Sequence, residues 1–273
     1  MSRTTYAHPP VVLALFQIKH LPEPSVHNRL PATAKSALAQ FTPLHRVDVT
    51  HQVQGQFDLT GSSGHRVIAE TAPLHRFYNR NRDLTISYGP DSLNVEASVY
   101  HGWQRFSAAI RSALDALSLP GGGLLIDGID RVGLRYLDEV RVPEAGREPT
   151  WADWIAPDLL PPQSLDGFAL VQQQSLALYS VNGGSDSLAL RYGAVNGPSA
   201  FASTDHLTRA EVPPGPYFLL DTDAFWLARP GDSLVEPTAQ ALMDMADRLH
   251  SPAKALFERS ITEKLRREVL DHD

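Results

Sequence analysis

The stretch RVGLRYLDEVRV, residues 131–142, alternates between apolar and charged side chains. Successive side chains of a β-strand point to opposite faces of its sheet. One face would carry Val132, Leu134, Tyr136, Val140 and Val142, and the other Arg131, Gly133, Arg135, Leu137, Glu139 and Arg141. A strand with one apolar face is typical of an antiparallel sheet that covers a core on one side.

The same period of two recurs upstream, where His45, Val47, Val49, His51 and Val53 share one face. This pattern predicts a half-buried antiparallel strand. Further strands are expected over residues 10–19, 66–78, 83–88, 92–98, 168–180, 187–195 and 217–228. Turn sequences such as Gly89-Pro90-Asp91 and Asn182-Gly183-Gly184 separate several of them.

Helical periodicity follows residue 103, where an apolar stripe comprises Trp103, Phe106, Ile110, Ala113, Leu114 and Leu117. A second stripe contains Leu242, Met245, Ala246 and Leu249. Ser251-Pro252 predicts the N-cap and first residue of a separate helix. Ser260-Ile261-Thr262-Glu263 predicts a capping box for a final helix.

These patterns together predict an α+β fold with two lobes of short antiparallel strands and amphipathic helices packed on one face. The lobes would be residues 1–142 and 166–273, joined by a Pro- and Trp-rich connector over residues 143–165. Trp151 and Trp154 suggest that this connector offers aromatic surface for packing. The strands form either two sheets or one sheet continued across both lobes. Leu134-Arg135-Tyr136 and Leu190-Arg191-Tyr192 echo each other, which suggests a diverged internal repeat.

Composition narrows the possible functions. The 273 residues include 24 basic and 31 acidic side chains, for a net charge of −7, which makes nucleic acid an unexpected partner. The chain has no cysteine, which excludes disulfides, thiolate metal sites and a cysteine nucleophile. The apolar run at residues 11–16 is too short to span a membrane, so we expect a cytoplasmic protein without a membrane partner.

Several segments carry a family resemblance, and they keep their order over most of the chain. They are Pro9-Pro10-Val11-Val12, Arg76-Phe77, Tyr100-x-x-Trp103-x-x-Phe106, Arg131-x-Gly133-Leu134-Arg135-Tyr136-Leu137, Phe218-Leu219-Leu220-Asp221-x-Asp223 and Leu249-His250…Phe257…Ile261-Thr262. In these segments the chain resembles a sporadically distributed, functionally uncharacterised bacterial protein family. Asp138 stands where that family usually has asparagine. The resemblance implies no established reaction, and its patchy occurrence implies an accessory gene in a defence, toxin–antitoxin or other mobile cluster.

Asp138 falls on the apolar face of its strand, where an isolated charge is very costly. A functional interpretation pairs it with arginines of another strand at a binding cleft. The structural alternative is an aspartate that reaches water at a sheet edge or forms an ion pair. Arg131, Arg135 and Arg141 on the opposite face could recognise an acidic partner or phosphate, or they could form a solvated face that Glu139 balances.

Two other stretches are candidates for chemistry. Asp221 and Asp223 share one face of a predicted strand and could hold a divalent cation, although Asp-x-Asp is a common string. Residues 75–82 mix aromatic side chains with Arg76, Arg80 and Arg82. This stretch could stack on bases, but a hairpin with a polar turn explains it better.

Motif searches find no dinucleotide fingerprint, phosphate-binding loop or nucleophile elbow. We therefore expect a non-enzymatic binding or accessory protein with no cofactor, a protein partner and a possible homodimer. The expected ligand- or partner-binding residues are Arg76, Arg80, Arg82, Arg131, Arg135, Tyr136, Asp138 and Arg141. The alternative is a metal-dependent hydrolase of a phosphoester or nucleotide, with Asp221 and Asp223 as metal ligands and Arg131 or Arg135 neutralising developing charge.

Overall fold

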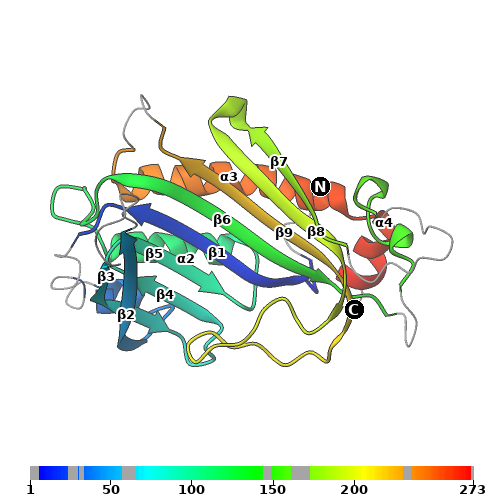
Figure 1. Ribbon diagram of the computed structural model, residues 1–273, viewed down its shortest axis with the longest axis horizontal. Helices are drawn as coiled ribbons and strands as arrows, with labels where there is room; N and C mark the ends of the chain where they lie inside the picture. The colour runs from blue at the N-terminus through cyan, green and yellow to red at the C-terminus, as the bar shows by residue number, and fades with distance from the viewer. Residues whose placement is uncertain are drawn as a thin grey trace.

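The computed structural model describes residues 6–23, 30, 34–56, 66–143, 149–160, 173–229 and 235–271. Its strands form one antiparallel sheet in the order β2-β3-β4-β5-β1-β6-β9-β8-β7 (Figure 1). The strands are β1 (Val11–His20), β2 (Leu44–Gln56), β3 (Arg66–Tyr78), β4 (Leu84–Tyr88), β5 (Ser92–Ala97), β6 (Ile129–Val140), β7 (Ser175–Val181), β8 (Asp186–Gly197) and β9 (Gly215–Leu227). The α+β fold class is confirmed.

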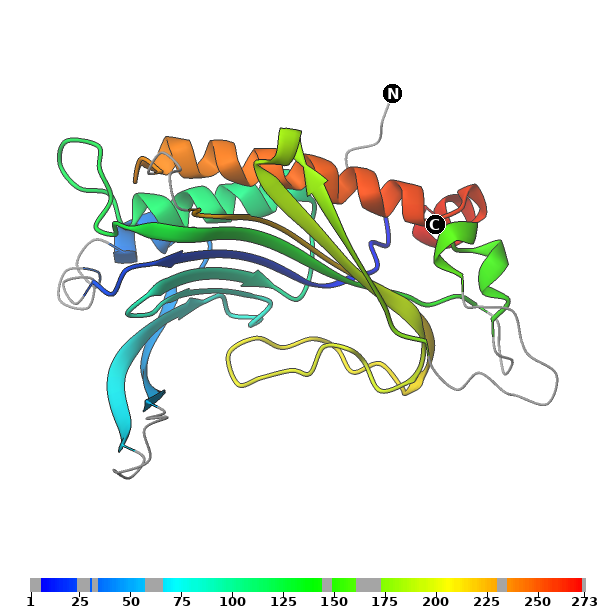
Figure 2. The same ribbon diagram turned by 45° about the horizontal axis from the view of Figure 1, so that its top comes forward.

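Two long helices, α2 (Trp103–Asp115) and α3 (Ala239–Ser260), lie on one face of the sheet (Figure 2). The short helix α4 (Glu263–Leu265) and a π-helical turn, η4 (Arg266–Leu270), follow α3. Single 3₁₀ turns are η1 (Trp151–Asp153), η2 (Pro157–Leu159) and η3 (Asn182–Gly184). The residues between β8 and β9 lie on the sheet face opposite the helices.

The core lies between the sheet and the two helices, as the period-two and helical patterns predict. Phe16 on β1 is fully buried and pairs in register with buried Leu134 on β6. Ile110 of α2 and Leu249 of α3 belong to the same cluster. The apolar face of residues 131–142 therefore points toward the helices, and the arginines on the opposite face of this strand point away from them.

The β6–β9 pair joins the strands before residue 142 to those after residue 166, so the described strands form one continuous sheet. On one side of the central β1–β6 pair the order is β5, β4, β3, and on the other it is β9, β8, β7. The Leu-Arg-Tyr tripeptides lie on β6 and β8, which do not correspond to each other in this arrangement. The two lobes and the internal repeat therefore stay predictions.

The hairpin of β2 and β3 extends away from the helices (Figure 2). Val47 and Val49 are consequently 50% and 62% exposed, and the burial expected for this part of the strand face is wrong. His45, nearer the core, stacks on Phe77 with ring centroids 4.3 Å apart. The strand itself was predicted correctly, but no helix in the described part of the chain covers Val47 and Val49. The side chains of His51 and Val53 lie outside the described residues.

Helix α3 runs through Pro252, so the expected helix start at Ser251-Pro252 is wrong. A proline inside a helix has no N–H to donate to the carbonyl four residues earlier. Here that carbonyl belongs to Arg248, and the side-chain amide of Asn182 donates to it at 3.4 Å. The Arg248 guanidinium also binds the buried Asp186 carboxylate at 2.9 and 3.0 Å. The Asn182 amide thus partners the carbonyl that Pro252 leaves free, and the Arg248–Asp186 ion pair holds the same turn of α3 against the start of β8.

The expected capping box at residues 260–263 is wrong, and the N-cap of the final helix lies two residues later than predicted. Ser260 ends α3 and donates its hydroxyl to the Leu256 carbonyl. Thr262 is the N-cap of α4, and its hydroxyl accepts the Leu265 N–H at 3.2 Å.

The tryptophans of the connector are buried in the protein's own fold. Trp151 is 7% exposed and packs against Phe218 with centroids 5.5 Å apart. Trp154 is 3% exposed and lies beneath the Lys264 ammonium, 4.1 Å from the ring centroid. Residues 149–160 of the connector therefore pack onto their own chain, and these two tryptophans supply no aromatic surface for a partner.

Candidate functional site

A cavity of about 420 Å³ opens between α3 and the sheet, on the helix side. We call it the helix-side pocket. Chain segments far apart in sequence line it. Its lining includes Tyr100, Trp103, Tyr136, Asp138, Thr222, His250, Lys254, Phe257, Glu258, Glu263, Arg266 and Asp271. Its volume is within the range of ordinary small-molecule sites.

Aromatic rings form one wall of this pocket and fix His250. The Tyr136 hydroxyl lies 3.0 Å from His250 Nδ1, and Trp103 stacks on the imidazole with centroids 4.2 Å apart. Tyr100 meets Tyr136 edge to face at 5.6 Å. Burial, with a smaller effect from Lys254, lowers the pKa of His250 to about 4. The imidazole is therefore neutral at pH 7.

Asp138 reaches this pocket because it lies on the helix face of β6, two residues beyond Tyr136. It is only 2% exposed. Burial is the main reason that its pKa is raised to about 8, and the charge of Asp221 adds to the effect. Within the described part of the chain its carboxyl group forms no hydrogen bond or ion pair. The expected pairing with arginines of another strand is therefore not observed.

Those arginines lie on the other face of the sheet and bind carboxylates of β9. Arg131 contacts both oxygens of Asp223 at 3.0 Å, and Arg135 contacts Asp221 at 2.6 and 2.7 Å. Arg191 from β8 adds a contact to Asp221 at 3.3 Å. The two Leu-Arg-Tyr tripeptides thus place an arginine on each side of one carboxylate.

This arrangement bears on the predicted metal site. Arginines occupy the carboxylate oxygens of Asp221 and Asp223 that a cation would need. Among the described residues, no group of three or more His, Asp or Glu side chains is placed to hold a metal ion. The metal site stays a prediction that the geometry does not favour.

Arg141 has its own internal partners. It forms an ion pair with buried Glu139 at 3.0 Å and lies over the Tyr217 ring, 4.8 Å from its centroid. Glu139 also accepts hydrogen bonds from the Ser199 hydroxyl and the Ala200 N–H, both at 2.5 Å. This group joins β6 to the residues that follow β8.

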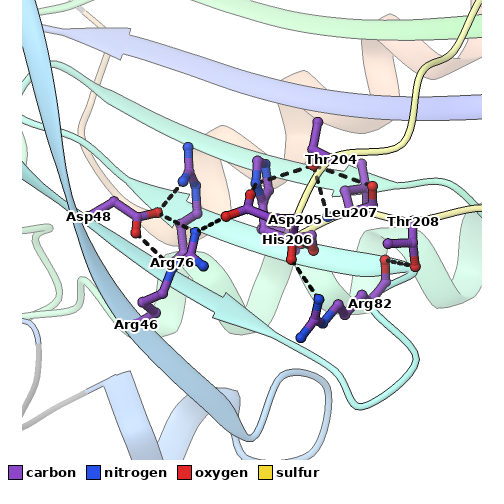
Figure 3. Close-up of polar contacts among 10 residues, drawn as sticks. Arg46, Asp48, Arg76, Arg82, Thr204, Asp205, His206, Leu207 and Thr208 are labelled. Atoms are coloured by element: carbon purple, nitrogen blue, oxygen red, sulfur yellow. Dashed lines mark hydrogen bonds and ion pairs between the residues drawn. The ribbon is translucent and has the colours of Figure 1, made fainter.

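Those residues, 198–214, form what we call the strap loop, and Figure 3 shows its contacts with the first strands. Arg46 binds Asp205 at 2.6 Å and Asp48 at 2.7 Å, and Arg76 also binds Asp48.

The backbone of the strap loop is tied down as well. Arg82 donates to the Asp205 carbonyl at 3.0 Å, and its own carbonyl accepts the Thr208 N–H at 2.6 Å. Arg76 and Arg82 therefore have structural partners, whereas Arg80 is exposed in the turn between β3 and β4. The predicted binding residues thus divide into Tyr136 and Asp138 in the helix-side pocket and the arginines outside it.

Sequence reasoning did not identify His250, Tyr100 and Trp103 as site residues. All three stand in segments that carry the family resemblance, but no motif spacing links them. Tyr136 and His250 are 114 positions apart, so only the packing of α3 on β6 brings them together. The buried-carboxylate argument for Asp138 was the signal that pointed to this pocket.

No family model matches this chain, and no curated protein matches it with significance. None of the helices in the described ranges combines the length and apolar character needed to cross a membrane.

Proposed function

We propose that this chain is a non-enzymatic binding protein whose ligand is a small molecule in the helix-side pocket. The observation that carries the proposal is Asp138, a buried carboxyl group that lines an aromatic cavity and has no partner among the described residues. A few convergent polar groups in a mostly apolar concave site are typical of small-molecule recognition. A buried polar group without a partner costs free energy, which a ligand can recover.

The state of the lining groups supports binding rather than turnover. His250 is neutral at pH 7, and its Nδ1 is already engaged by Tyr136. Burial raises the pKa of Tyr100 to about 12 and that of Tyr136 well above 10. General acid–base catalysis works best with a group whose pKa lies near the operating pH and that is free to reach the substrate. These three side chains act better as a rigid, neutral wall.

The family resemblance supports an accessory role with a protein partner, which includes a second copy of this chain. Under this proposal the small molecule and the protein partner are separate ligands. One experiment can detect both.

The test is native mass spectrometry of the tagged protein purified from bacteria that carry the gene. We expect a bound small molecule on the wild-type chain, its loss in Asp138→Asn and its retention in Asp115→Asn. Asp115 is an exposed aspartate at the end of α2 and makes a matched control. A wild-type chain without any small molecule, or a chain that turns over the molecule it carries, would contradict the proposal.

A further inference from the structure

Negative charge predominates around the helix-side pocket once Asp138 is ionised. The lining includes four carboxyl groups and two cationic side chains, which are Asp138, Glu258, Glu263, Asp271, Lys254 and Arg266. Arg266 is itself engaged, since it binds Glu258 at 3.1 Å and Glu263 at 3.3 Å. Asp138 is the member that lies deepest in the fold, between the sheet and α3.

The walls next to Asp138 suit a cation as well. Tyr100 and Tyr136 stand beside its carboxyl group, and Trp103 contributes a third ring to the pocket. The faces of such rings carry negative electrostatic potential and attract organic cations. Tyrosine hydroxyl oxygens also accept hydrogen bonds, as an ammonium group requires.

We propose that the helix-side pocket binds an organic cation, with an alkylammonium head group at Asp138 and an apolar part among the aromatic rings. This inference rests on the proposed function and names the class of its ligand. A buried carboxylate without a counter-ion is costly, and a cationic ligand supplies that counter-ion. An anionic ligand would face Asp138 and would have to compete with two carboxylates for Arg266, so that Lys254 is the remaining cation among the described lining residues.

The test compares three probes of similar shape and different charge by isothermal titration calorimetry at pH 8. They are phenethylammonium, neutral 2-phenylethanol and anionic phenylacetate. We expect phenethylammonium to bind at least about tenfold more tightly than the alcohol, because only the cation forms a charge-assisted contact with Asp138. Asp138→Asn should remove this preference, and Asp115→Asn should keep it.

The wild-type protein provides a second readout that needs no variant. Asp138 must lose its proton to pair with a cation, and burial raises its pKa to about 8. Affinity for phenethylammonium should therefore rise about tenfold per pH unit below pH 8 and then level off. Three groups beside Asp138 titrate elsewhere, since the pKa of His250 is about 4, that of Tyr100 is about 12 and that of Tyr136 is raised well above 10. The charge of Asp221, on the other face of the sheet, contributes to the raised pKa of Asp138.

Each failure has a distinct meaning. If 2-phenylethanol or phenylacetate binds as tightly as phenethylammonium or more tightly, the proposal of a cationic ligand is wrong, although the pocket is still a binding site. If none of the three probes binds at millimolar concentration, the proposal of a cationic ligand is also wrong. The proposed function is then tested separately, by whether native mass spectrometry detects a bound small molecule. An unchanged preference for the cation in Asp138→Asn overturns the assignment of its head group to Asp138.

Discussion

Asp138 and His250 change the stability of the protein with pH in opposite directions. The pKa of Asp138 is about 8 in the folded chain, against an ordinary value of about 3.9 when unfolded. The folded state binds the extra proton, so this group makes stability fall as pH rises between those values. The pKa of His250 is about 4 when folded, against about 6.5 when unfolded. Here the unfolded state binds the extra proton, so this group makes stability rise with pH over that range.

The two effects offset each other between about pH 4 and 6.5, and of these two groups only Asp138 still changes the stability from there to about pH 8. We predict that the free energy of unfolding of the wild type falls from pH 6.5 to 8 by up to about 2 kcal/mol. Asp138→Asn should remove this decline, because its side chain does not titrate. Urea titrations at three pH values measure both curves, and an equal decline in the variant would contradict the assignment.

The Tyr136 hydroxyl is predicted to stabilise the pocket wall through His250. Tyr136→Phe removes the group 3.0 Å from Nδ1 and leaves a half-buried ring nitrogen without this partner. The expected loss is about 1–3 kcal/mol in the free energy of unfolding. Tyr179→Phe removes a hydroxyl from the exposed edge strand β7 and should change little. If both variants lost the same stability, the contact with His250 would not be the cause.

At the scale of elements, we predict that helix α3 is supported at Pro252 by a residue outside it. Asn182 has a φ of 53°, and its side-chain amide donates to the Asp186 carboxylate at 2.6 Å and, at 3.4 Å, to the carbonyl that Pro252 leaves without a helical partner. Asn182→Gly keeps the left-handed backbone accessible and removes the amide. We predict a loss of about 1 kcal/mol in the wild-type background.

In Pro252→Ala the backbone N–H returns and can bond the Arg248 carbonyl. The loss caused by Asn182→Gly should therefore be smaller in that background, and a double-mutant cycle by urea unfolding measures the coupling. Strictly additive effects would show that Asn182 does not compensate for Pro252.

The elements that could be predicted from the sequence are those set by local patterns, and those that depend on contacts between distant residues could not. The strand predicted over residues 130–142 is observed as β6, Ile129–Val140, because alternation is a local property of the chain. The helix predicted from the apolar stripe between Trp103 and Leu117 is likewise observed, as α2. The continuation of α3 through Pro252 was missed because the group that contacts the freed Arg248 carbonyl, Asn182, is 66 positions away in the sequence.

The residues of the candidate site show the same difference between local patterns and distant contacts. Asp138 could be identified from its own strand, because a carboxylate on an apolar face is a local anomaly. The partners of Arg131 and Arg135 could not be identified, since the register of β6 on β9 places Asp223 opposite Arg135 and Asp221 opposite Leu137. Charges that look available in one strand were therefore neutralised by another.

At the scale of the whole molecule, the continuous sheet predicts cooperative unfolding. Trp103 and Trp226 pack with the main core. Trp151 and Trp154 pack with a second hydrophobic cluster, which includes Val140, Phe218, Leu220 and Ile261. Strands β6 and β9 run through both clusters. We predict one urea transition with the same midpoint by tryptophan fluorescence and by far-UV circular dichroism. Two separated transitions would favour the division into lobes at residues 1–142 and 166–273.

The pairing of β6 with β9 is one connection between the first strands and the later part of the chain. The strap loop is a second, because it contacts β2 and β4. Asp205 binds both Arg46 and His206, and these contacts lower its pKa below the usual carboxyl value of about 3.9. The ionised Asp205 side chain therefore stabilises the folded protein above that value. This stabilisation is lost only as the pH falls through the lowered pKa of Asp205. Thr85 and Ser98 hold the same loop by donating to the carbonyls of His206 and Thr208 at 2.7 and 2.6 Å.

We predict that Asp205→Asn weakens the ends of the strap loop without unfolding the sheet. Arg46 retains Asp48 at 2.7 Å, so the β2–β3 end should stay intact while residues 203–209 open more often. Hydrogen exchange measured by mass spectrometry should then be faster in that segment and unchanged in peptides from β1 and β6, because local opening is independent of global unfolding. Arg80→Ala, in the exposed turn beside Arg82, is the control and should leave the exchange of the strap loop unchanged. Faster exchange throughout the sheet in Asp205→Asn would instead mean that the strap loop is part of the same cooperative unit as the core.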